Sequence, residues 1–233
     1  AYASELRAVV RSLPIREGDA VMDMACGDGA YLPWLSECVG GAGRVAAVDA
    51  DPAFLEAAQG RCGATPNVEF VLAAVDALPF PDGTFDLCWC AQSLYSLPEP
   101  VAALQALWRV VKPGGWVAVL ENDTLHHVVL PWPIDVELAA RAAELAVLAE
   151  ESGDPEKFYV GRNLRTTFRE AGFEAVGLLT LTWDRSSPLG ADERAFLAKH
   201  VEELASRAVG ALDGSLRRRL EALCDPASGS YVL

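Results

Sequence analysis

The run Ala20–Gly29 constrains the fold of this chain more than any other feature. It reads Ala-Val-Met-Asp-Met-Ala-Cys-Gly-Asp-Gly, so an apolar segment gives way to a turn of small residues. A second apolar segment, Val45–Asp49, ends in an acid. A buried strand that opens into such a turn lets backbone amides approach a ligand, and an acid after the next strand can accept hydrogen bonds from ribose hydroxyls. The pattern predicts a sheet that binds a nucleoside.

The spacing of the glycines decides between two kinds of nucleoside. A dinucleotide fingerprint requires the pattern Gly-x-Gly-x-x-Gly. Counting on from Gly27 and Gly29, Leu32 stands where the third glycine is needed. The sequence therefore disfavours a nicotinamide dinucleotide, although an NAD-dependent oxidoreductase stays open as an alternative function.

What remains of the pattern is Asp23-x-Ala25-x-Gly27-x-Gly29. It resembles motif I of the class I methyltransferases that use S-adenosylmethionine, usually written D/E-x-G-x-G-x-G. Ala25 departs from the motif, because the family has its first glycine at that position. We expect an alanine methyl to fit such a turn only if φ is negative at Ala25.

Three further segments extend this resemblance in the family's order, over about residues 18–122. Val68–Phe80 is similar to the third strand and its following loop, where the family places an acid beside the adenine amino group. Phe85–Leu94 is similar to the fourth strand. Arg109–Glu121 is similar to a helix end, a tight turn and the fifth strand. The resemblance implies S-adenosylmethionine as cofactor, S-adenosylhomocysteine as product, and no metal.

The alternation of apolar segments with helical patterns predicts an α/β fold, in which a Rossmann-like, doubly wound and mostly parallel sheet carries helices on both faces. A sixth strand is expected over Ala175–Trp183. The family closes its sheet with an antiparallel seventh strand, for which only Tyr231–Leu233 remain. We therefore expect the seventh strand to be truncated, or to be completed by residues beyond Leu233. The helices expected around the sheet are residues 30–39, 52–61, 98–111 and 164–171.

The whole chain, residues 1–233, is predicted to be a single methyltransferase domain with its cofactor-binding core at 18–122. Residues 123–160 contain an amphipathic helix pattern and leave the fifth strand at its carboxyl end. Ligands bind at that edge of open α/β sheets, so this segment predicts a helical lid. Residues 190–224 predict a further helical pair. The apolar faces of these helices could pack on the core or on a second subunit, which leaves a homo-oligomer open.

The resemblance implies a role for each residue of the cofactor site. Asp49 would bind the ribose hydroxyls, Asp76 the adenine amino group, and the turn the methionine part of the cofactor. Asp23 would orient the turn or contact the methionine ammonium. Each acid could instead be structural, as a strand end, a turn former or a buried hydrogen-bond acceptor. The predicted cofactor-binding residues are Asp23, Ala25, Cys26, Gly27, Asp49, Ala50, Asp76, Ala77, Ala91 and Gln92.

Residues for the methyl acceptor and for proton removal are harder to choose. His126 and His127 follow the fifth strand, and histidine titrates near neutral pH, so either could act as a general base. Tyr31 and Tyr95 could line an acceptor pocket. Trp132, between two prolines, could give the lid a rigid aromatic element. All five side chains could equally be packed or exposed without a role in catalysis.

Composition excludes several partners. The chain has 33 acidic and 19 basic residues and a formal net charge of −14, which disfavours nucleic acid as a substrate. No apolar run reaches membrane-spanning length, so no membrane partner is expected. The six cysteines form no paired Cys-x-x-Cys clusters, and we expect reduced thiols in a cytoplasmic protein. Cys88 and Cys90 should share one face of a strand.

These observations predict an enzyme that transfers a methyl group from S-adenosylmethionine to a small, apolar or aromatic metabolite. They do not choose between O-, N- and C-methylation, because one fold supports all three. A non-catalytic regulatory module that keeps the nucleoside pocket is an alternative from a different functional class.

Overall fold

The computed structural model describes residues 2–63, 65–97, 99–123, 128–153, 155–185, 188–208, 213–225 and 228. The chain divides into two compact units. One, here called the sheet unit, contains Tyr2–Asn122 and Val160–Leu178. The other, here called the helical unit, contains Asp123–Tyr159 and Leu179–Leu233. Each unit is described by itself.

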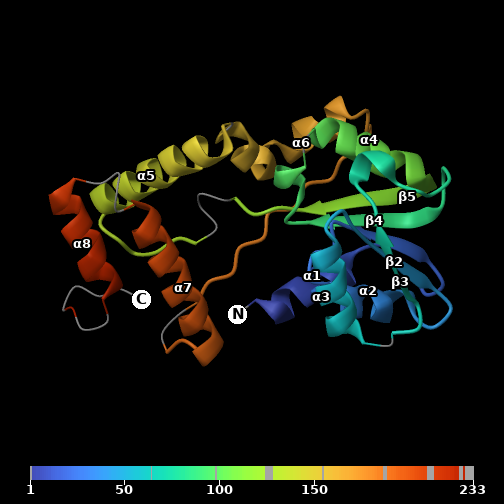
Figure 1. The fold of residues 1–233 in the computed structure, drawn as a ribbon, viewed down its shortest axis with the longest axis horizontal. Helices are drawn as coiled ribbons and strands as arrows, with labels where there is room; N and C mark the ends of the chain where they lie inside the picture. Colours follow the sequence, from blue (N-terminus) through green and yellow to red (C-terminus); the bar gives the residue numbers. More distant parts are fainter. Residues whose placement is uncertain are drawn as a thin grey trace. The chain divides into compact units, whose positions relative to one another are not determined.

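A parallel five-stranded sheet forms the centre of the sheet unit, with the strand order β3-β2-β1-β4-β5 (Figure 1). This confirms the predicted Rossmann-like fold. The order reverses between β1 and β4, and such a reversal opens a crevice at the carboxyl ends of the two strands where ligands bind. The strands are β1 (Ala20–Met24), β2 (Arg44–Asp49), β3 (Val68–Leu72), β4 (Phe85–Ala91) and β5 (Val111–Leu120).

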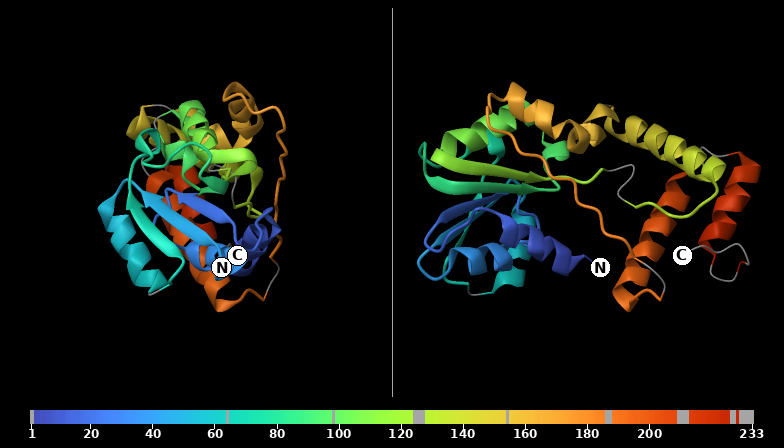
Figure 2. Two further views of the ribbon diagram at one scale, coloured as in Figure 1. Left: turned by 90° about the vertical axis from the view of Figure 1, so that its right-hand side faces the viewer. Right: turned by 180° about the vertical axis from the view of Figure 1, so that it is seen from behind.

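Helices cover both faces of this sheet, as expected for a doubly wound fold (Figures 1 and 2). One face carries α1 (Ala3–Ser12), α2 (Leu32–Val39) and α3 (Pro52–Cys62). The other carries α4 (Pro100–Val110) and α6 (Val160–Glu170). Two short 3-10 helices, η1 (Val75–Ala77) and η2 (Leu94–Ser96), follow β3 and β4.

The start of α3 shows how the sequence sets a helix end. Asp51 is the N-cap, and its carboxylate accepts a 2.8 Å hydrogen bond from the Ala53 amide. Pro52 follows at the first helical position, where its missing N–H costs nothing. The helix therefore begins directly after Asp51, two residues beyond the end of β2.

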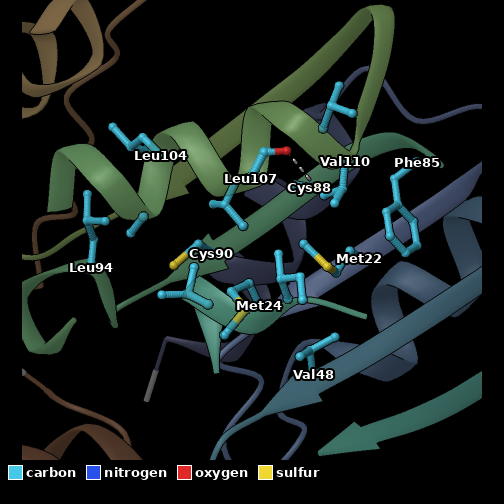
Figure 3. Close-up of a cluster of buried hydrophobic side chains, with 14 of the residues drawn as sticks. Met22, Met24, Val48, Phe85, Cys88, Cys90, Leu94, Leu104, Leu107 and Val110 are labelled. Atoms are coloured by element: carbon cyan, nitrogen blue, oxygen red, sulfur yellow. Dashed lines mark hydrogen bonds between the residues drawn. The ribbon is translucent and has the colours of Figure 1, made fainter. Parts of the chain in front are cut away.

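Side-chain alternation along the strands divides the buried residues into two apolar clusters, one on each face of the sheet. Cys88 and Cys90 both lie in the cluster beneath α4, which confirms that they share a face (Figure 3). The Cys88 thiol lies 3.9 Å from the carbonyl oxygen of Leu107 on α4. Burial raises the pKa of both thiols.

The segment Lys112-Pro-Gly-Gly115 forms a wide bulge at the start of β5. Val111 pairs with Phe85, but the next pair is Trp116 with Leu87. A side chain at Gly115 would lie 2.6 Å from the carbonyl oxygen of Asp86, so the backbone of the bulge packs against β4. The predicted tight turn is therefore part of the strand rather than a loop before it.

The predicted sixth strand is wrong for the described residues. Residues 175–183 contain no strand, and Leu179 within them is 74% exposed. A strand needs a hydrogen-bonded neighbour. Among the described residues, β5 pairs only with β4 and is the edge strand of the sheet, so no strand lies beyond it. The residues predicted to form a truncated seventh strand, 231–233, lie outside the described residues.

The helical unit consists of α5 (Ile134–Ser152), η3 (Pro155–Tyr159), α7 (Ala191–Ala208) and α8 (Gly214–Cys224). Apolar side chains of α5, α7 and α8 form one buried cluster, so segments 123–160 and 190–224 pack on each other. Arg141 is buried on α5 and donates to the Val128 carbonyl oxygen at 2.7 Å and to Glu137 at 3.1 Å. In the described part of the chain, none of the helices has the length and apolar character to cross a bilayer.

Candidate functional site

All ten predicted cofactor-binding residues lie at the carboxyl edge of the sheet. The strands are parallel, so residues that end them or follow them meet at this edge. Asp23 is the last but one residue of β1, and Asp49 ends β2. Asp76 and Ala77 lie in η1 after β3, and Ala91 ends β4. Ala25, Cys26, Gly27, Ala50 and Gln92 follow β1, β2 or β4 directly.

The turn after β1 is fixed to β2 by backbone hydrogen bonds. The Cys26 amide donates to the carbonyl oxygen of Val48 at 3.0 Å, and the Gly27 amide donates to Asp49 Oδ2 at 2.9 Å. The φ angle is 54° at Gly27 and 76° at Gly29. A Cβ at Gly29 would lie 3.0 Å from the Ala58 side chain, whereas one at Gly27 would meet no atom within 4 Å. Gly29 thus permits helix packing, and Gly27 leaves an open approach to the backbone.

The expectation that an alanine fits this turn only at negative φ is wrong, because φ is 55° at Ala25. The left-handed conformation brings Cβ close to the following carbonyl oxygen, at a cost of about 1–2 kcal/mol. The turn therefore keeps the backbone path that a glycine would take and bears the strain of the alanine methyl. The surrounding contacts to β2 hold it there.

Asp49 has both carboxylate oxygens bound to backbone amides. Oδ2 accepts from Gly27, and Oδ1 accepts from Asp51 at 2.9 Å. The side chain is 8% exposed. An ionised carboxylate can accept about four hydrogen bonds, so two acceptor positions remain for a ligand hydroxyl pair.

Asp23 is 1% exposed, and its Oδ2 has no hydrogen-bond partner among the described residues. Burial, with a smaller contribution from the charge of Asp49, raises the pKa of Asp23 to about 8. A buried acceptor without a partner is costly unless a ligand or water completes it. A cationic group at this position would restore the ionised form.

Asp76 and its neighbour Ala77 are exposed on η1. A hydrogen bond connects the loop that leads to Asp76 with the end of β2: the Ala73 amide donates to the backbone carbonyl oxygen of Asp49 at 3.0 Å. The β2 and β3 ends are thus joined at the edge where the adenine ring is expected.

The loop after β4 contacts the turn after β1. Gln92 has a φ of 53°, and Ala25 and Gln92 are the two non-glycine residues with positive φ in the described chain. The Ser93 hydroxyl lies 3.4 Å from the carbonyl oxygen of Ala25. Strained backbone of this kind concentrates at functional sites.

Glu121 was not predicted as a site residue, although it follows β5 at the same edge. Its Oε1 accepts hydrogen bonds from the backbone amides of Ser93 at 3.0 Å and Leu94 at 2.6 Å. Burial raises the pKa of Glu121 to about 7, against the opposing effect of the amides of Leu94, Ser93 and Tyr95. Its position in the sequence could have indicated a role, since Glu121 directly follows an apolar strand, much as Asp49 ends one.

Two of the predicted acceptor residues, Tyr31 and Tyr95, lie on opposite faces of the sheet. Tyr31 is buried on the α2 face against Trp89, with ring centroids 5.6 Å apart, and its hydroxyl has no hydrogen-bond partner among the described residues. Burial raises the pKa of Tyr31 to about 12. Tyr95 packs against the cluster on the opposite face. Trp132 is buried in the helical unit, and His126 and His127 lie outside the described residues.

Comparisons with known proteins agree with this geometry. A family model described as "Methyltransferase domain" matches residues 22–119. The ubiquinone/menaquinone biosynthesis C-methyltransferase of Escherichia coli O1:K1 is 33% identical over 184 residues, which are 72% of this chain and 71% of that protein. The chain belongs to the class I S-adenosylmethionine-dependent methyltransferases. The methyltransferase of the same description from Pseudoalteromonas translucida is 28% identical over 187 residues, which are 76% of this chain and 74% of that protein.

Solved structures place this methyltransferase in the same fold. An S-adenosylmethionine-dependent methyltransferase from Aquifex aeolicus superimposes with a TM-score of 0.57 at 26% identity, covering 72% of this chain and 82% of its own. The YcgJ protein of Bacillus subtilis has the same TM-score at 18% identity, and the superposition covers 92% of this chain and 87% of that protein. At this identity the likeness shows the fold alone.

The cofactor of this methyltransferase fits the residues at the carboxyl edge. The unpartnered Asp23 oxygen can accept a hydrogen bond from the methionine ammonium, which is a cation. The open face of Gly27 leaves room for the methionine part beside the turn. Family membership favours S-adenosylmethionine over the NAD alternative. Among the described residues, no group of three or more His, Cys, Asp or Glu side chains is placed to hold a metal ion.

Proposed function

We propose that this methyltransferase acts on a small apolar or aromatic metabolite and that a hydroquinone ring is the first acceptor to test. The observation that carries the proposal is the 33% identity, over 72% of the chain, to a C-methyltransferase of ubiquinone and menaquinone biosynthesis. The net charge of −14 supports it, because an acidic surface repels nucleic acid.

The proposed division of labour follows from the contacts at the carboxyl edge. Asp49 binds the ribose hydroxyls through its two remaining acceptor positions, and Asp76 receives the adenine amino group. Asp23 accepts the methionine ammonium, and the Ala25–Gly29 turn lies along the methionine part. Ala91 and Gln92 border the methyl group. When bound, S-adenosylmethionine supplies a methyl on a positively charged sulfur, so the chain must mainly hold the acceptor in line and exclude water.

The predicted lid over residues 123–160 stays a proposal, because this segment follows β5 in the sequence and ligands bind at the carboxyl edge of open α/β sheets. Within this segment, His126 and His127 stay candidates for the general base, and Trp132 for an aromatic contact. A homo-oligomer also stays a proposal.

The decisive experiment measures S-adenosylhomocysteine formation with defined acceptors. The test acceptor is a reduced 1,4-naphthohydroquinone with a short prenyl chain and no ring methyl, and a transfer RNA serves as the comparison. We expect turnover with the hydroquinone only. Gly27→Ala should abolish it, and Gly63→Ala, a glycine at φ 57° with equally open surroundings, should not.

The same experiment separates the enzyme from a binding module. Binding of S-adenosylhomocysteine without turnover of any small aromatic acceptor would favour the module. Failure of folded protein to bind S-adenosylhomocysteine at all would contradict the assignment of these residues to the cofactor site.

A further inference from the structure

We propose that Glu121 is a positioning residue for methyl transfer, which fixes the backbone of residues 92–95 beside the reacting methyl. The inference rests on the proposed function, because this loop matters for catalysis only if Ala91 and Gln92 border the methyl group. Nothing in the sequence resemblance assigned Glu121 a role.

The first support is the pattern of hydrogen bonds. One oxygen of Glu121 accepts from two successive backbone amides, Ser93 at 3.0 Å and Leu94 at 2.6 Å. The preceding amide, of Gln92, donates to the carbonyl oxygen of Leu120 at 2.7 Å. Three consecutive amides of the loop are therefore bound by the two residues at the end of β5. Bonds to a carboxylate are stronger than those to a neutral acceptor.

The second support is that the held backbone is strained. Gln92 has a φ of 53°, a conformation that residues other than glycine, asparagine and aspartate rarely adopt. Such a conformation persists only where neighbouring contacts fix it. The carboxylate of Glu121 supplies these contacts on the C-terminal side of Gln92.

The third support is the link to the cofactor turn. Ser93, whose amide is bound by Glu121, directs its hydroxyl to the Ala91 carbonyl oxygen at 2.9 Å and to that of Ala25 at 3.4 Å. A shift of Ser93 would thus be felt at Ala25, the first residue after β1. Glu121 acts on the cofactor through this chain of contacts and not by touching it.

Glu121 is itself held from the α6 side. A Cβ at Gly161 would lie 3.4 Å from the Glu121 Cβ and 2.7 Å from the carbonyl oxygen of Asn122. The first turn of α6 therefore packs directly on residues 121–122. Residues 121–122 and the start of α6 therefore pack together within the sheet unit.

The test compares Glu121→Gln with Glu121→Ala in the full chain. The glutamine amide keeps a carbonyl oxygen that can accept from both amides, whereas alanine removes the acceptor. Asp213→Ala is the matched control, because Asp213 also accepts from two successive amides, those of Ser215 and Leu216, but at the start of α8. The readouts are amide hydrogen exchange over residues 91–97, the S-adenosylhomocysteine dissociation constant from calorimetry, and turnover measured as S-adenosylhomocysteine formation.

A positioning role predicts that Glu121→Ala speeds exchange at Ser93 and Leu94 at least tenfold and weakens S-adenosylhomocysteine binding at least fivefold. Glu121→Gln should restore both to within about twofold of wild type. Asp213→Ala should leave both exchange and binding unchanged. Thermal unfolding of each variant checks that the sheet unit remains folded.

Two results would overturn the inference. One is Glu121→Ala with unchanged exchange and unchanged binding. The other is Glu121→Gln as impaired as Glu121→Ala in turnover while both bind S-adenosylhomocysteine normally, which would make the carboxylate a proton acceptor instead. Wild-type protein that binds no S-adenosylhomocysteine would contradict the proposed function rather than the backbone role of Glu121, since the exchange comparison would still stand.

Discussion

Asp49 Oδ2 accepts a 2.9 Å hydrogen bond from the backbone amide of Gly27, so the acid that ends β2 also fixes the turn that follows β1. The proposed ribose and methionine parts of the cofactor site are therefore coupled through one side chain. Loss of this carboxylate should disturb both.

Asp49→Ala should weaken S-adenosylhomocysteine binding at least tenfold, or about 1.4 kcal/mol, because it removes both the ribose acceptor and the Gly27 contact. Titration calorimetry measures the change. Asp19→Ala is the control, since Asp19 also accepts from a backbone amide, that of Arg16 at 2.7 Å, but precedes β1 at the opposite edge. Equal affinities of the two variants would refute the ribose role of Asp49.

Binding of S-adenosylhomocysteine near pH 7 should release up to one proton. The pKa of Asp23 is raised to about 8, so its carboxyl is mostly protonated in the free protein. A ligand ammonium beside the unpartnered oxygen favours the ionised form and expels the proton. Calorimetry in phosphate and in Tris buffer gives the proton count from the difference in apparent enthalpy. Asp23→Asn should bind without release, and identical release by both proteins would rule out this site for the ammonium.

The free energy of unfolding should fall as pH rises from about 4 to 8. Because the folded pKa of Asp23 lies above the unfolded value of 3.8, its contribution is fully present below about pH 3.8 and is lost as pH rises through 8. The slope is about 1.4 kcal/mol per pH unit for one proton. Urea unfolding at pH 5, 6, 7 and 8 measures it, with Asp23→Asn as reference. A difference between the two proteins that does not change with pH would contradict the raised pKa.

Gly27→Ala and Gly63→Ala should cost similar stability but differ in ligand binding. Both glycines have a positive φ, 54° and 57°, and neither has an atom within 4 Å of an added Cβ. Each substitution therefore adds backbone strain without a steric clash. Only the methyl at Gly27 would occupy the open side of the turn, so only that variant should lose S-adenosylhomocysteine affinity. Parallel loss in both would mean that strain, and not blocked access, is responsible.

Ala25→Gly should raise the free energy of unfolding by about 1 kcal/mol, because glycine adopts the left-handed conformation without the Cβ clash. Ala57→Gly, on the exposed side of α3, is the same chemical change in an ordinary helix and should lower stability by about 1 kcal/mol. Guanidinium unfolding of both variants measures whether the free energy of unfolding rises or falls in each. A loss of stability in Ala25→Gly would be inconsistent with a φ of 55° at this residue.

The sequence predicted the sheet core because its strands end in residues with a specific chemistry, as at Asp49. It could not predict the conformation of Ala25, where the contacts of the Cys26 and Gly27 amides with β2 override the local preference of alanine. The apolar alternation at residues 175–183 favoured a strand, but local pattern cannot supply a pairing partner. Glu121 escaped notice because its importance lies in the two backbone amides that it binds, which only the folded chain brings within reach.

The bulge at Lys112–Gly115 also bears on where Glu121 stands. Between Val111 and Trp116 the chain uses five residue steps, while β4 uses two between their partners Phe85 and Leu87. The three extra steps lie at the end of β5 that is far from Glu121. The register of Trp116–Leu120 on β4, and not the path of the chain through the bulge, therefore determines where the Glu121 carboxylate stands.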